Sequence, residues 1–208
     1  MREEQTIKES LRVFYNQDAQ RRNESSSEPW KLTERTRFLE ELQQQGIGKD
    51  FLELGAGTGK DSLYFQEQGF TVTAIDLSPA MVELCKEKQL NAHVMDFTQR
   101  ELPPETFDAV YAFNSLLHTP KKELSLVLTN VHRVLKPKGF FYLGVYGGNE
   151  FEGVWQEDWA EPKRFFAYYT DKALLEIVTD VFELVYFRQV VVERGVGFHF
   201  QSLMLRKS

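Results

Sequence analysis

The amino-acid sequence predicts an α/β fold, in which helices cover both faces of a mostly parallel sheet. Three short stretches rich in β-forming residues each end in or beside an acidic residue, at Glu53, Asp76 and Asp96. Glycines at every second position follow the first stretch, and a helical segment separates it from the second. Because parallel strands end at one edge of a sheet, we expect the three acids to lie together at that edge.

The composition is that of an ordinary globular protein. The chain has 208 residues, of which 42% are hydrophobic and 27% charged, and this length suits a single domain over residues 1–208. A net charge of −6 and a pI of 5.4 argue against a broad surface for nucleic acid or anionic membrane. We therefore expect neither nucleic acid nor a membrane among the partners.

The cysteine count and the hydropathy pattern bear on location and on metal binding. The single cysteine, Cys85, cannot form an internal disulfide, so the cytoplasm is the expected location. No apolar run approaches the length of a membrane span, and the N-terminus lacks the core of a signal peptide. No histidine, cysteine or carboxylate cluster has metal-ligand spacing, which predicts no catalytic metal.

Residues 1–48 are expected to form a helical cap. The amphipathic pattern of residues 1 to 18 predicts a first helix, and the polar, serine-rich residues 21–28 predict a loop. A second helix is expected to begin at Pro29 and to end before Gly46.

Residues 51–61 (Phe-Leu-Glu-Leu-Gly-Ala-Gly-Thr-Gly-Lys-Asp) predict a strand, a tight turn and the start of a helix. Glycine suits such a turn because it adopts positive φ and lets a ligand approach the backbone. The dinucleotide fingerprint would need glycine where Lys60 stands, and the P-loop would need other residues in place of Leu54 and Asp61. What remains is an acidic-x-Gly-x-Gly-x-Gly pattern led by Glu53, or an ordinary strand-to-helix turn without a ligand.

This pattern resembles motif I of the class I S-adenosylmethionine-dependent methyltransferases. The cofactor of that family has an ammonium group that Glu53 would favour and a carboxylate suited to a helix N-terminus. Residues 76–81 (Asp-Leu-Ser-Pro-Ala-Met) resemble the family's next motif, whose acid accepts the ribose hydroxyls. Residues 92–97 resemble the third, whose acid reaches the adenine amino group while its neighbour lines the ring.

The resemblance implies a Rossmann-like three-layer sandwich, with a seven-stranded, mostly parallel sheet whose last strand is antiparallel. It also implies a set of cofactor-binding residues: Tyr15, Glu53, Gly55, Ala56, Gly57, Thr58, Gly59, Asp76, Leu77, Ser78, Met81, Asp96, Phe97 and Asn114. Two of them have an equally simple structural interpretation. Tyr15 is also a plausible aromatic of a helix face, and Ser78 before Pro79 has the character of a helix N-cap.

The second half of the sequence continues the alternation of strands and helices. Residues 107–113 predict a strand, and Thr119 and Pro120 predict the N-cap and first residue of a helix that runs to Leu135. A strand is expected at 140–145. The turn before it, Leu-Lys-Pro-Lys-Gly, resembles the family's Leu-Lys-Pro-Gly-Gly turn with lysine in place of the first glycine.

Residues 147–169 are rich in aromatic and charged side chains and have no clean period. Beside the active edge, such an insertion is a candidate lid or substrate wall, and the alternative is a segment that packs on its own aromatics. Thr170 is expected to cap a helix that ends near residue 180. A closing hairpin is expected over 183–205, with its turn at 193–197.

The function that the resemblance implies is methyl transfer from S-adenosylmethionine to a small-molecule acceptor. His118 follows the fourth strand and is the candidate general base, although a structural loop histidine is the alternative. An RNA or protein methyltransferase would need a basic stripe, and Lys121, Lys122, Lys136 and Lys138 make only a thin one. A non-catalytic S-adenosylmethionine-binding module is the third possibility. The sequence leaves the acceptor and the oligomeric state undecided.

Overall fold

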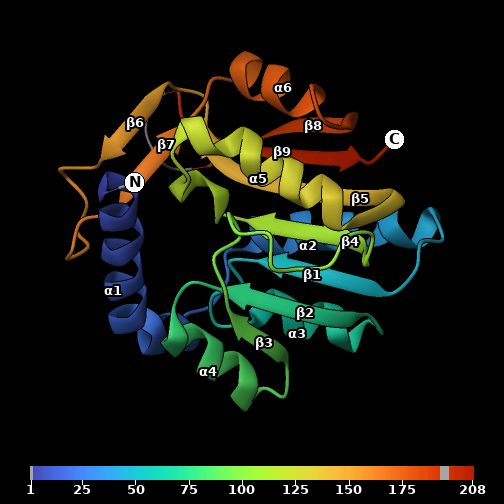
Figure 1. The fold of residues 1–208 in the computed structure, drawn as a ribbon, viewed down its shortest axis with the longest axis horizontal. Coiled ribbons are helices and arrows are strands. Elements are labelled where there is room, and N and C mark those ends of the chain that lie inside the picture. The colour runs from blue at the N-terminus through green and yellow to red at the C-terminus, as the bar shows by residue number, and fades with distance from the viewer. Residues whose placement is uncertain (1, 193–196) are drawn as a thin grey trace.

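The computed structural model describes residues 2–192 and 197–208, which form a twisted sheet with helices on both faces (Figure 1). Among the described residues, the main sheet has seven strands in the order β3-β2-β1-β4-β5-β9-β8. Their bounds are β1 Asp50–Leu54, β2 Thr71–Asp76, β3 Asn91–Val94, β4 Phe107–Phe113, β5 Leu135–Gly147, β8 Glu183–Val191 and β9 His199–Arg206. β9 runs antiparallel to both of its neighbours, and β1 to β5 pair in parallel. The predicted sheet is thereby confirmed.

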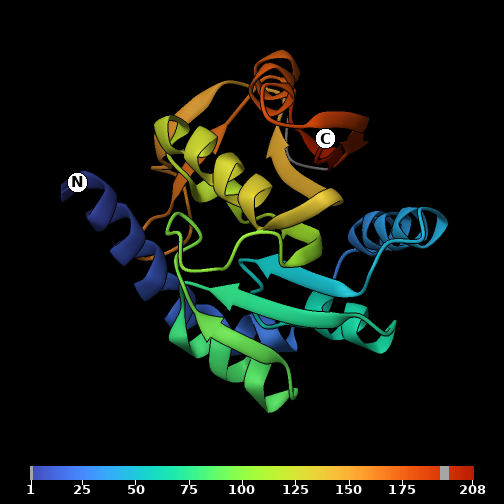
Figure 2. The ribbon, with the colours of Figure 1, turned by 45° about the vertical axis from the view of Figure 1, so that its right-hand side comes forward.

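Helices α2 (Pro29–Gln44), α3 (Lys60–Glu67) and α4 (Pro79–Glu87) pack on one face of the sheet. Helices α5 (Lys121–Val134) and α6 (Asp171–Thr179) pack on the other. The long helix α1 (Arg2–Glu24) belongs to neither layer. It lies across the carboxyl ends of the strands, at the left of Figure 1 and again in the turned view of Figure 2. None of the described helices combines the length and the apolar character needed to cross a membrane.

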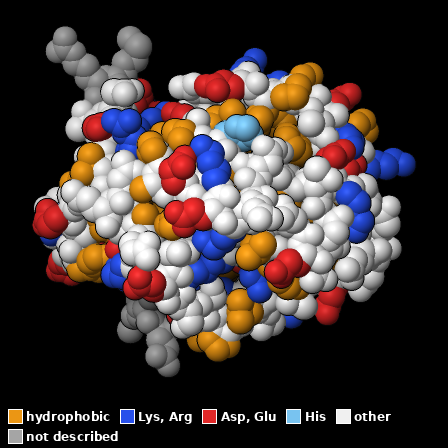
Figure 3. All heavy atoms as spheres, turned by 90° about the horizontal axis from the view of Figure 1, so that it is seen from below, with side chains coloured by type: hydrophobic (Ala, Val, Ile, Leu, Met, Phe, Trp, Pro, Cys, Tyr) orange, Lys and Arg blue, Asp and Glu red, His pale blue; other side chains and the backbone are white. Residues whose placement is uncertain are grey.

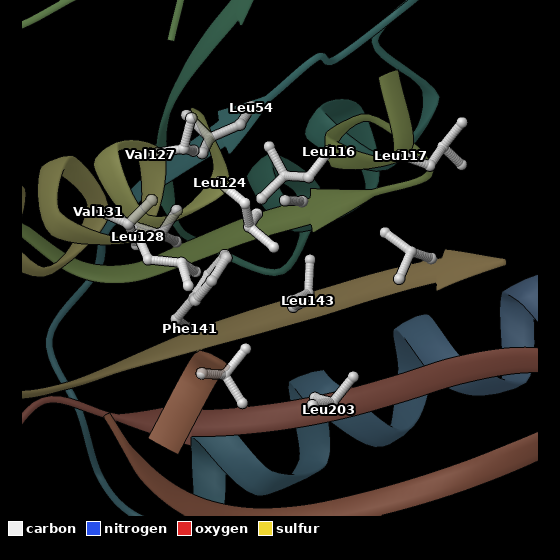
Figure 4. Close-up of a cluster of buried hydrophobic side chains, with 14 of the residues drawn as sticks. Leu54, Leu116, Leu117, Leu124, Val127, Leu128, Val131, Phe141, Leu143 and Leu203 are labelled. Carbon is white, nitrogen blue, oxygen red and sulfur yellow. The ribbon is translucent and has the colours of Figure 1, made fainter. Parts of the chain in front are cut away.

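The core beneath α5 follows from the spacing of its apolar residues. Leu124, Val127, Leu128 and Val131 recur at intervals of three or four and are buried. They meet side chains of the sheet such as Phe141 (Figure 4). This burial fixes α5, and with it the connection that leads from β4 into the helix.

An aromatic cluster fills the opposite face. Phe38 of α2 stacks on Tyr111 of β4, with ring centroids 5.6 Å apart. Phe51 of β1 stacks on Phe65 of α3 at 4.3 Å. Large rings bury much apolar area in few residues, so this cluster holds α2 and α3 rigidly against the strands that lead into the glycine turn.

The first helix is longer than predicted. It ends at Glu24 instead of near residue 18, so the loop shrinks to residues 25–28. The reason is local: Arg21 and Arg22 both bond the carboxylate of Asp18, at 2.6 and 2.7 Å, across one turn of helix.

The first residues of α5 and of β5 also differ from the prediction. Pro120 is the N-cap and adopts an extended conformation (φ −53°, ψ 141°), so the helix begins at Lys121, while Thr119 only closes a short 3-10 turn over Leu116–His118. β5 begins directly at Leu135, and Lys138 adopts a positive φ of 65°. Lysine therefore takes at this turn the backbone conformation for which glycine is the usual residue.

The aromatic insertion contains regular structure that the sequence did not suggest. β6 (Phe151–Val154) and β7 (Phe165–Tyr168) pair antiparallel as a separate two-stranded sheet beside α1. β7 is buried on both faces and β6 only in part, which removes the alternation expected of a half-buried strand. The predicted turn of the closing hairpin, residues 193–197, lies outside the described residues except for Gly197.

Candidate functional site

A cavity of about 270 Å³ opens at the carboxyl ends of the parallel strands, beneath α1. It brings together most of the residues predicted for the site: Tyr15, Glu53, Gly55, Ala56, Gly57, Asp76, Leu77, Met81, Asp96, Phe97, Asn114 and His118. The edge where parallel strands end is the usual ligand site of an open α/β sheet.

The glycine turn forms the floor of the cavity. At Gly55 (φ 70°) a Cβ atom would lie 2.4 Å from the Cβ of Ser115, so no larger residue fits. At Gly57 (φ 55°) a Cβ would meet nothing within 4 Å, which leaves bare backbone facing open space. The two glycines thus serve two needs, close packing below and ligand access above.

Asp76 ends β2 and is fixed by backbone groups. Its Oδ2 accepts a hydrogen bond from the Gly57 N–H, and its Oδ1 accepts one from the Ser78 N–H, both at 2.8 Å. Burial raises the pKa of Asp76, and these two hydrogen bonds oppose that rise. The carboxylate is therefore held in one orientation at the rim of the glycine turn, with lone pairs left for a ligand.

Two further acids, Glu53 and Asp61, line the cavity. Glu53 is 3% exposed and accepts a hydrogen bond from the Ser62 hydroxyl. Burial and the nearby charge of Asp61 raise the pKa of Glu53 well above its usual range. Asp61 itself pairs with Arg35 at 2.8 Å, and burial raises its pKa as well. Such a pair of desolvated carboxyls favours a cationic ligand group.

Asp96 lies just beyond β3 and is tied to the first helix. Its Oδ1 accepts hydrogen bonds from the Thr98 N–H (2.9 Å) and hydroxyl (2.7 Å), and its Oδ2 pairs with Lys8 Nζ at 2.9 Å. Although burial acts in the opposite direction, these partners lower the pKa of Asp96. Lys8 also lies 3.6 Å from Glu123 at the start of α5, so one lysine bridges α1 to two sides of the cavity.

The connection that follows β4 presents polar atoms without partners. Asn114 adopts a positive φ of 56°. Its Oδ1, the Ser115 hydroxyl and the Thr119 hydroxyl are buried and have no hydrogen-bond partner among the described residues. All three residues line the cavity. A buried polar atom without a partner is costly, so these atoms point to a ligand that completes their hydrogen bonds.

Tyr15 and His118 form a hydrogen-bonded pair at the α1 side of the cavity. The Tyr15 hydroxyl lies 2.6 Å from His118 Nε2, and His118 Nδ1 lies 2.7 Å from the Phe165 carbonyl oxygen. A carbonyl oxygen only accepts, so Nδ1 carries the proton and Nε2 accepts from Tyr15. Burial lowers the pKa of His118 to about 3, which keeps the ring neutral.

Three predicted site residues lie outside the lining of the cavity. Thr58 is buried, and Gly59 serves as the N-cap of α3. The Ser78 hydroxyl accepts from the Met81 N–H at 3.2 Å and donates to Asn16 Oδ1 at 2.6 Å. Ser78 therefore caps α4 and fastens α1 to it, as its N-cap interpretation suggests.

The sequence reasoning missed the contributions of the cap and of the loops between motifs. These residues also line the cavity: Lys8, Leu11, Arg22, Ser27, Lys31, Asp61, Met95, Thr98, Phe113, Ser115, Thr119, Pro120 and Glu123. Asp61 is the last residue of the stretch 51–61, and Ser115 directly follows the predicted Asn114, so their neighbours along the chain could have indicated both. Lys8 and Arg22 had no local signal, because only the docking of α1 brings them to the sheet.

Among the residues described, no three histidine, cysteine, aspartate or glutamate side chains come together in a way that could hold a metal ion.

Comparison with known proteins agrees with this geometry. The family model of the methyltransferase domain matches residues 52–143, the segment that carries the glycine turn and the three acids. The family model and the relatives below are methyltransferases, which confirms the resemblance of this segment to the class I S-adenosylmethionine-dependent methyltransferases seen in the sequence.

Particular relatives cover parts of the chain. The malonyl-[acyl-carrier protein] O-methyltransferase of Serratia marcescens is 32% identical over 115 residues, 53% of this chain and 44% of that protein. The putative methyltransferase YqeM of Bacillus subtilis is 34% identical over 102 residues, 46% of this chain and 41% of that protein. The chain thus spans less than half the length of these curated relatives.

Solved structures show the same fold over nearly the whole chain. The 1,6-didemethyltoxoflavin-N1-methyltransferase of Burkholderia thailandensis, bound to 1,6-didemethyltoxoflavin and S-adenosylhomocysteine, superposes with a TM-score of 0.75. Its identity is 22%, and the match covers 99% of this chain and 90% of that one. The N-methyltransferase NodS of Bradyrhizobium japonicum, with S-adenosylhomocysteine, has a TM-score of 0.66 at 16% identity, covering 93% and 98%.

Proposed function

We propose that this chain binds S-adenosylmethionine in the cavity and transfers its methyl group to a small-molecule acceptor. One observation carries the proposal: the glycine turn, Asp76, Asp96 and the unpartnered atoms of the β4–α5 connection line a single cavity. When bound, the cofactor supplies a methyl group already activated on a sulfonium, so the protein has chiefly to bind, orient and exclude water.

The residues present suit the polar groups of this cofactor. Glu53 and Asp61 favour its ammonium, and the bare backbone at Gly57 suits the close approach of its amino-acid part. Asp76 has lone pairs for the ribose hydroxyls, while Asp96 and Phe97 suit the adenine amino group and ring. Asn114 Oδ1 offers a further acceptor for a donor group of the cofactor.

Two features favour a small acceptor. The cavity is covered by α1, whose Lys8, Leu11 and Tyr15 line it, which limits the size of what can enter. On the face shown in Figure 3, Lys and Arg side chains are interspersed with Asp and Glu and do not gather into the basic stripe that nucleic acid needs. The Burkholderia methyltransferase, whose fold this chain shares, is likewise named for a small molecule, which it holds in its structure.

The first experiment is calorimetric titration of the protein with S-adenosylhomocysteine, with NAD and ATP as controls. Binding of S-adenosylhomocysteine alone is expected. Binding of a control instead, or of nothing, would contradict the assignment of the cofactor.

Transfer must be tested separately from binding, because fold does not fix chemistry. For example, SpnF, which shares this fold with a TM-score of 0.63 at 20% identity, is named as a [4+2]-cyclase and not as a methyltransferase. Radiolabelled S-adenosylmethionine offered with a panel of phenols, thiols, amines and nitrogen heterocycles should label at least one acceptor. Tight binding with no labelled product across the panel would favour a binding module.

If the acceptor carries a proton, a base must remove it. His118 lines the cavity, and its ring is neutral and can therefore accept a proton. We propose that His118 is this base.

A further inference from the structure

We propose that Tyr15 is the catalytic residue that receives the proton of the methyl acceptor, and that it passes its own hydroxyl proton to His118. This inference rests on the proposed methyl transfer and deepens it. It replaces the cofactor contact expected for Tyr15 with a role in proton transfer.

The hydrogen bonds of His118 require an intermediary. Nδ1 donates its proton to the Phe165 carbonyl at 2.7 Å, and the lone pair of Nε2 accepts the Tyr15 hydroxyl at 2.6 Å. Both ring nitrogens are therefore occupied. A proton from the cavity can reach Nε2 only through the oxygen of Tyr15, which lines the same cavity.

The surroundings of Tyr15 assist its proton in leaving. The guanidinium of Arg22 lies 4.9 Å from the centre of the Tyr15 ring. Burial raises the pKa of Tyr15, and the positive charges of Arg22 and Arg164 oppose that rise. Arg164 is held in place by Asp158, which accepts two hydrogen bonds from it at 2.7 and 2.8 Å. The positive charges of Arg22 and Arg164 favour the Tyr15 oxygen while its proton moves towards His118.

The site is assembled from segments far apart in the chain. Tyr15 comes from α1, His118 from the connection after β4, and the Phe165 carbonyl from β7 of the insertion. The Phe165 carbonyl fixes the tautomer and the ring orientation of His118, the part that an orienting group plays beside a catalytic base.

The proposed step balances as follows. The attacking atom of the acceptor forms a bond to the methyl carbon, and the carbon–sulfur bond breaks with its electron pair going to sulfur. The acceptor's proton moves to the Tyr15 oxygen, and the Tyr15 proton moves to Nε2 of His118. The positive charge that began on sulfur ends on the imidazolium. A histidine with a pKa of about 3 suffices, because a hydroxyl that has just been methylated is a far stronger acid.

The relay defines a class of acceptor. It serves a nucleophile that carries a proton on the attacking atom, such as a hydroxyl or a ring N–H. A tertiary amine or a thioether has no proton to lose and would gain nothing from Tyr15.

The test compares Tyr15→Phe with the wild type and with Tyr64→Phe. Tyr64 packs against Arg35 on α2, away from the lining of the cavity, so Tyr64→Phe is a matched control. Affinity for S-adenosylhomocysteine, measured by calorimetry, should stay within about threefold in both variants, since the relay lies outside cofactor binding. Methyl transfer to 1,6-didemethyltoxoflavin and to the panel acceptors that carry a proton on the attacking atom should fall roughly 100-fold or more in Tyr15→Phe only.

Nitrogen-15 NMR of histidine-labelled protein supplies a readout that needs no turnover. In the wild type, His118 should carry its proton on Nδ1 and stay neutral down to a pH near its pKa of about 3. In Tyr15→Phe, the Nε2 resonance should shift and the pKa of His118 should rise, because the neutral ring loses a donor. A proton on Nε2 in the wild type, or an Nε2 signal indifferent to Tyr15→Phe, would overturn the relay whether or not a probe is methylated.

The variant His118→Gln keeps a hydrogen-bond acceptor but cannot take a proton. It should lose as much activity as Tyr15→Phe, and the double variant should lose no more, since both interrupt one path. Additive losses would show that the two residues act separately. If the wild type does not bind S-adenosylhomocysteine, the proposed function is refuted. Failure of the proposed function is thereby distinguished from failure of the relay.

Discussion

Glu53 and Asp76 are acidic residues at the ends of neighbouring strands, and their different surroundings suit them to different roles. Asp76 is held by the backbone N–H groups of Gly57 and Ser78. Glu53 has the Ser62 hydroxyl as its hydrogen-bond donor and lies near a second acid, the half-buried Asp61. The backbone therefore orients the carboxyl of Asp76, whereas the carboxyl of Glu53 would be stabilised in its ionised form by a positively charged ligand group.

Glu53 should make cofactor binding depend on pH. Because burial and Asp61 raise its pKa well above the usual value, Glu53 is protonated in the free protein where an exposed glutamate is ionised. A bound ammonium favours the ionised form, so binding lowers this pKa and releases a proton. The affinity for S-adenosylhomocysteine should therefore rise with pH until Glu53 is ionised in the free protein.

Calorimetry across pH, in two buffers of different ionisation enthalpy, measures both the affinity and the protons released. Glu53→Gln should weaken binding and flatten the pH dependence, whereas Glu83→Gln on the surface of α4 should change neither. A pH profile unaltered in Glu53→Gln would place the ammonium elsewhere.

Asp76→Ala should weaken binding of S-adenosylhomocysteine by about 1.5–3 kcal/mol, the range of a hydrogen bond to a charged group. This corresponds to a roughly 10- to 100-fold higher Kd. The loss also frees the N–H groups of Gly57 and Ser78, so the melting temperature should be followed in parallel. Unchanged affinity in a folded variant would show that Asp76 does not contact the ribose.

The predicted residues that line the cavity are mostly those whose neighbours along the chain reveal them. The glycine turn and Asp76 sit in contiguous motifs, where spacing alone indicates geometry. Lys8 and Arg22 reach the cavity through the docking of α1, a contact across many residues that no local pattern encodes. His118 was predicted as a base, but its link to Tyr15 depends on the same docking.

At the scale of elements, α1 depends on polar contacts at several points along its length. Lys8 pairs with Asp96, Asn16 accepts from Ser78, and Lys60 donates to the Arg22 carbonyl at 2.7 Å. Near its end, Lys88 bonds Asn23 at 2.8 Å. Apolar contacts add to these, since Leu11, Phe14 and Ala19 of α1 are buried and Ala19 packs against Met81 and Leu84 of α4.

Lys8→Met should loosen the N-terminal half of α1 while leaving the domain folded. Lys8 is partly exposed, so the global stability should fall by no more than about 1 kcal/mol. Backbone hydrogen exchange should quicken in α1 and stay unchanged in α5. Arg12→Met is the matched control, because the ion pair that Arg12 makes among the described residues is with Glu9 of the same helix. Equal exchange in the two variants would show that Lys8 does not anchor the helix.

The insertion shows where element prediction fails. Its strands are short, and β7 has no exposed face, so the period that marks a strand is missing. Partners distant in sequence stabilise it: Arg164 lies over Phe14 of α1 at 4.9 Å, and Trp159 lies edge-on to the same ring at 5.5 Å. Whether residues 147–169 move as a lid stays a proposal.

For the whole molecule, the alternation of strand and helix predicted a mostly parallel sheet, and the family resemblance added its seven strands and the antiparallel last strand. Each strand and helix buries its apolar residues against the neighbouring layer. The need to bury these residues therefore determines both the hydrophobic pattern along the chain and the layers of the fold. The observed boundaries of helices and strands differ from the predicted ones where a proline or a positive φ determines the local geometry, as at Pro120 and Lys138.

Leu128→Ala should destabilise the domain by about 2–5 kcal/mol, because the side chain is fully buried in the core beneath α5 (Figure 4). Leu126→Ala, two residues away and 43% exposed, should cost about 0.5 kcal/mol or less. Chemical denaturation of the two variants measures the difference. Similar losses would mean that α5 does not pack as described.

The helix that covers the cavity has a kinetic consequence. A ligand lying beneath Lys8, Leu11 and Tyr15 is covered on that side by α1, so lifting of the helix should speed the exit of the spent cofactor. The contacts that hold α1 include ion pairs near the surface, and dissolved salt weakens such pairs. Residence times of S-adenosylhomocysteine should therefore shorten as ionic strength rises, and an enzyme limited by product release would turn over faster in salt.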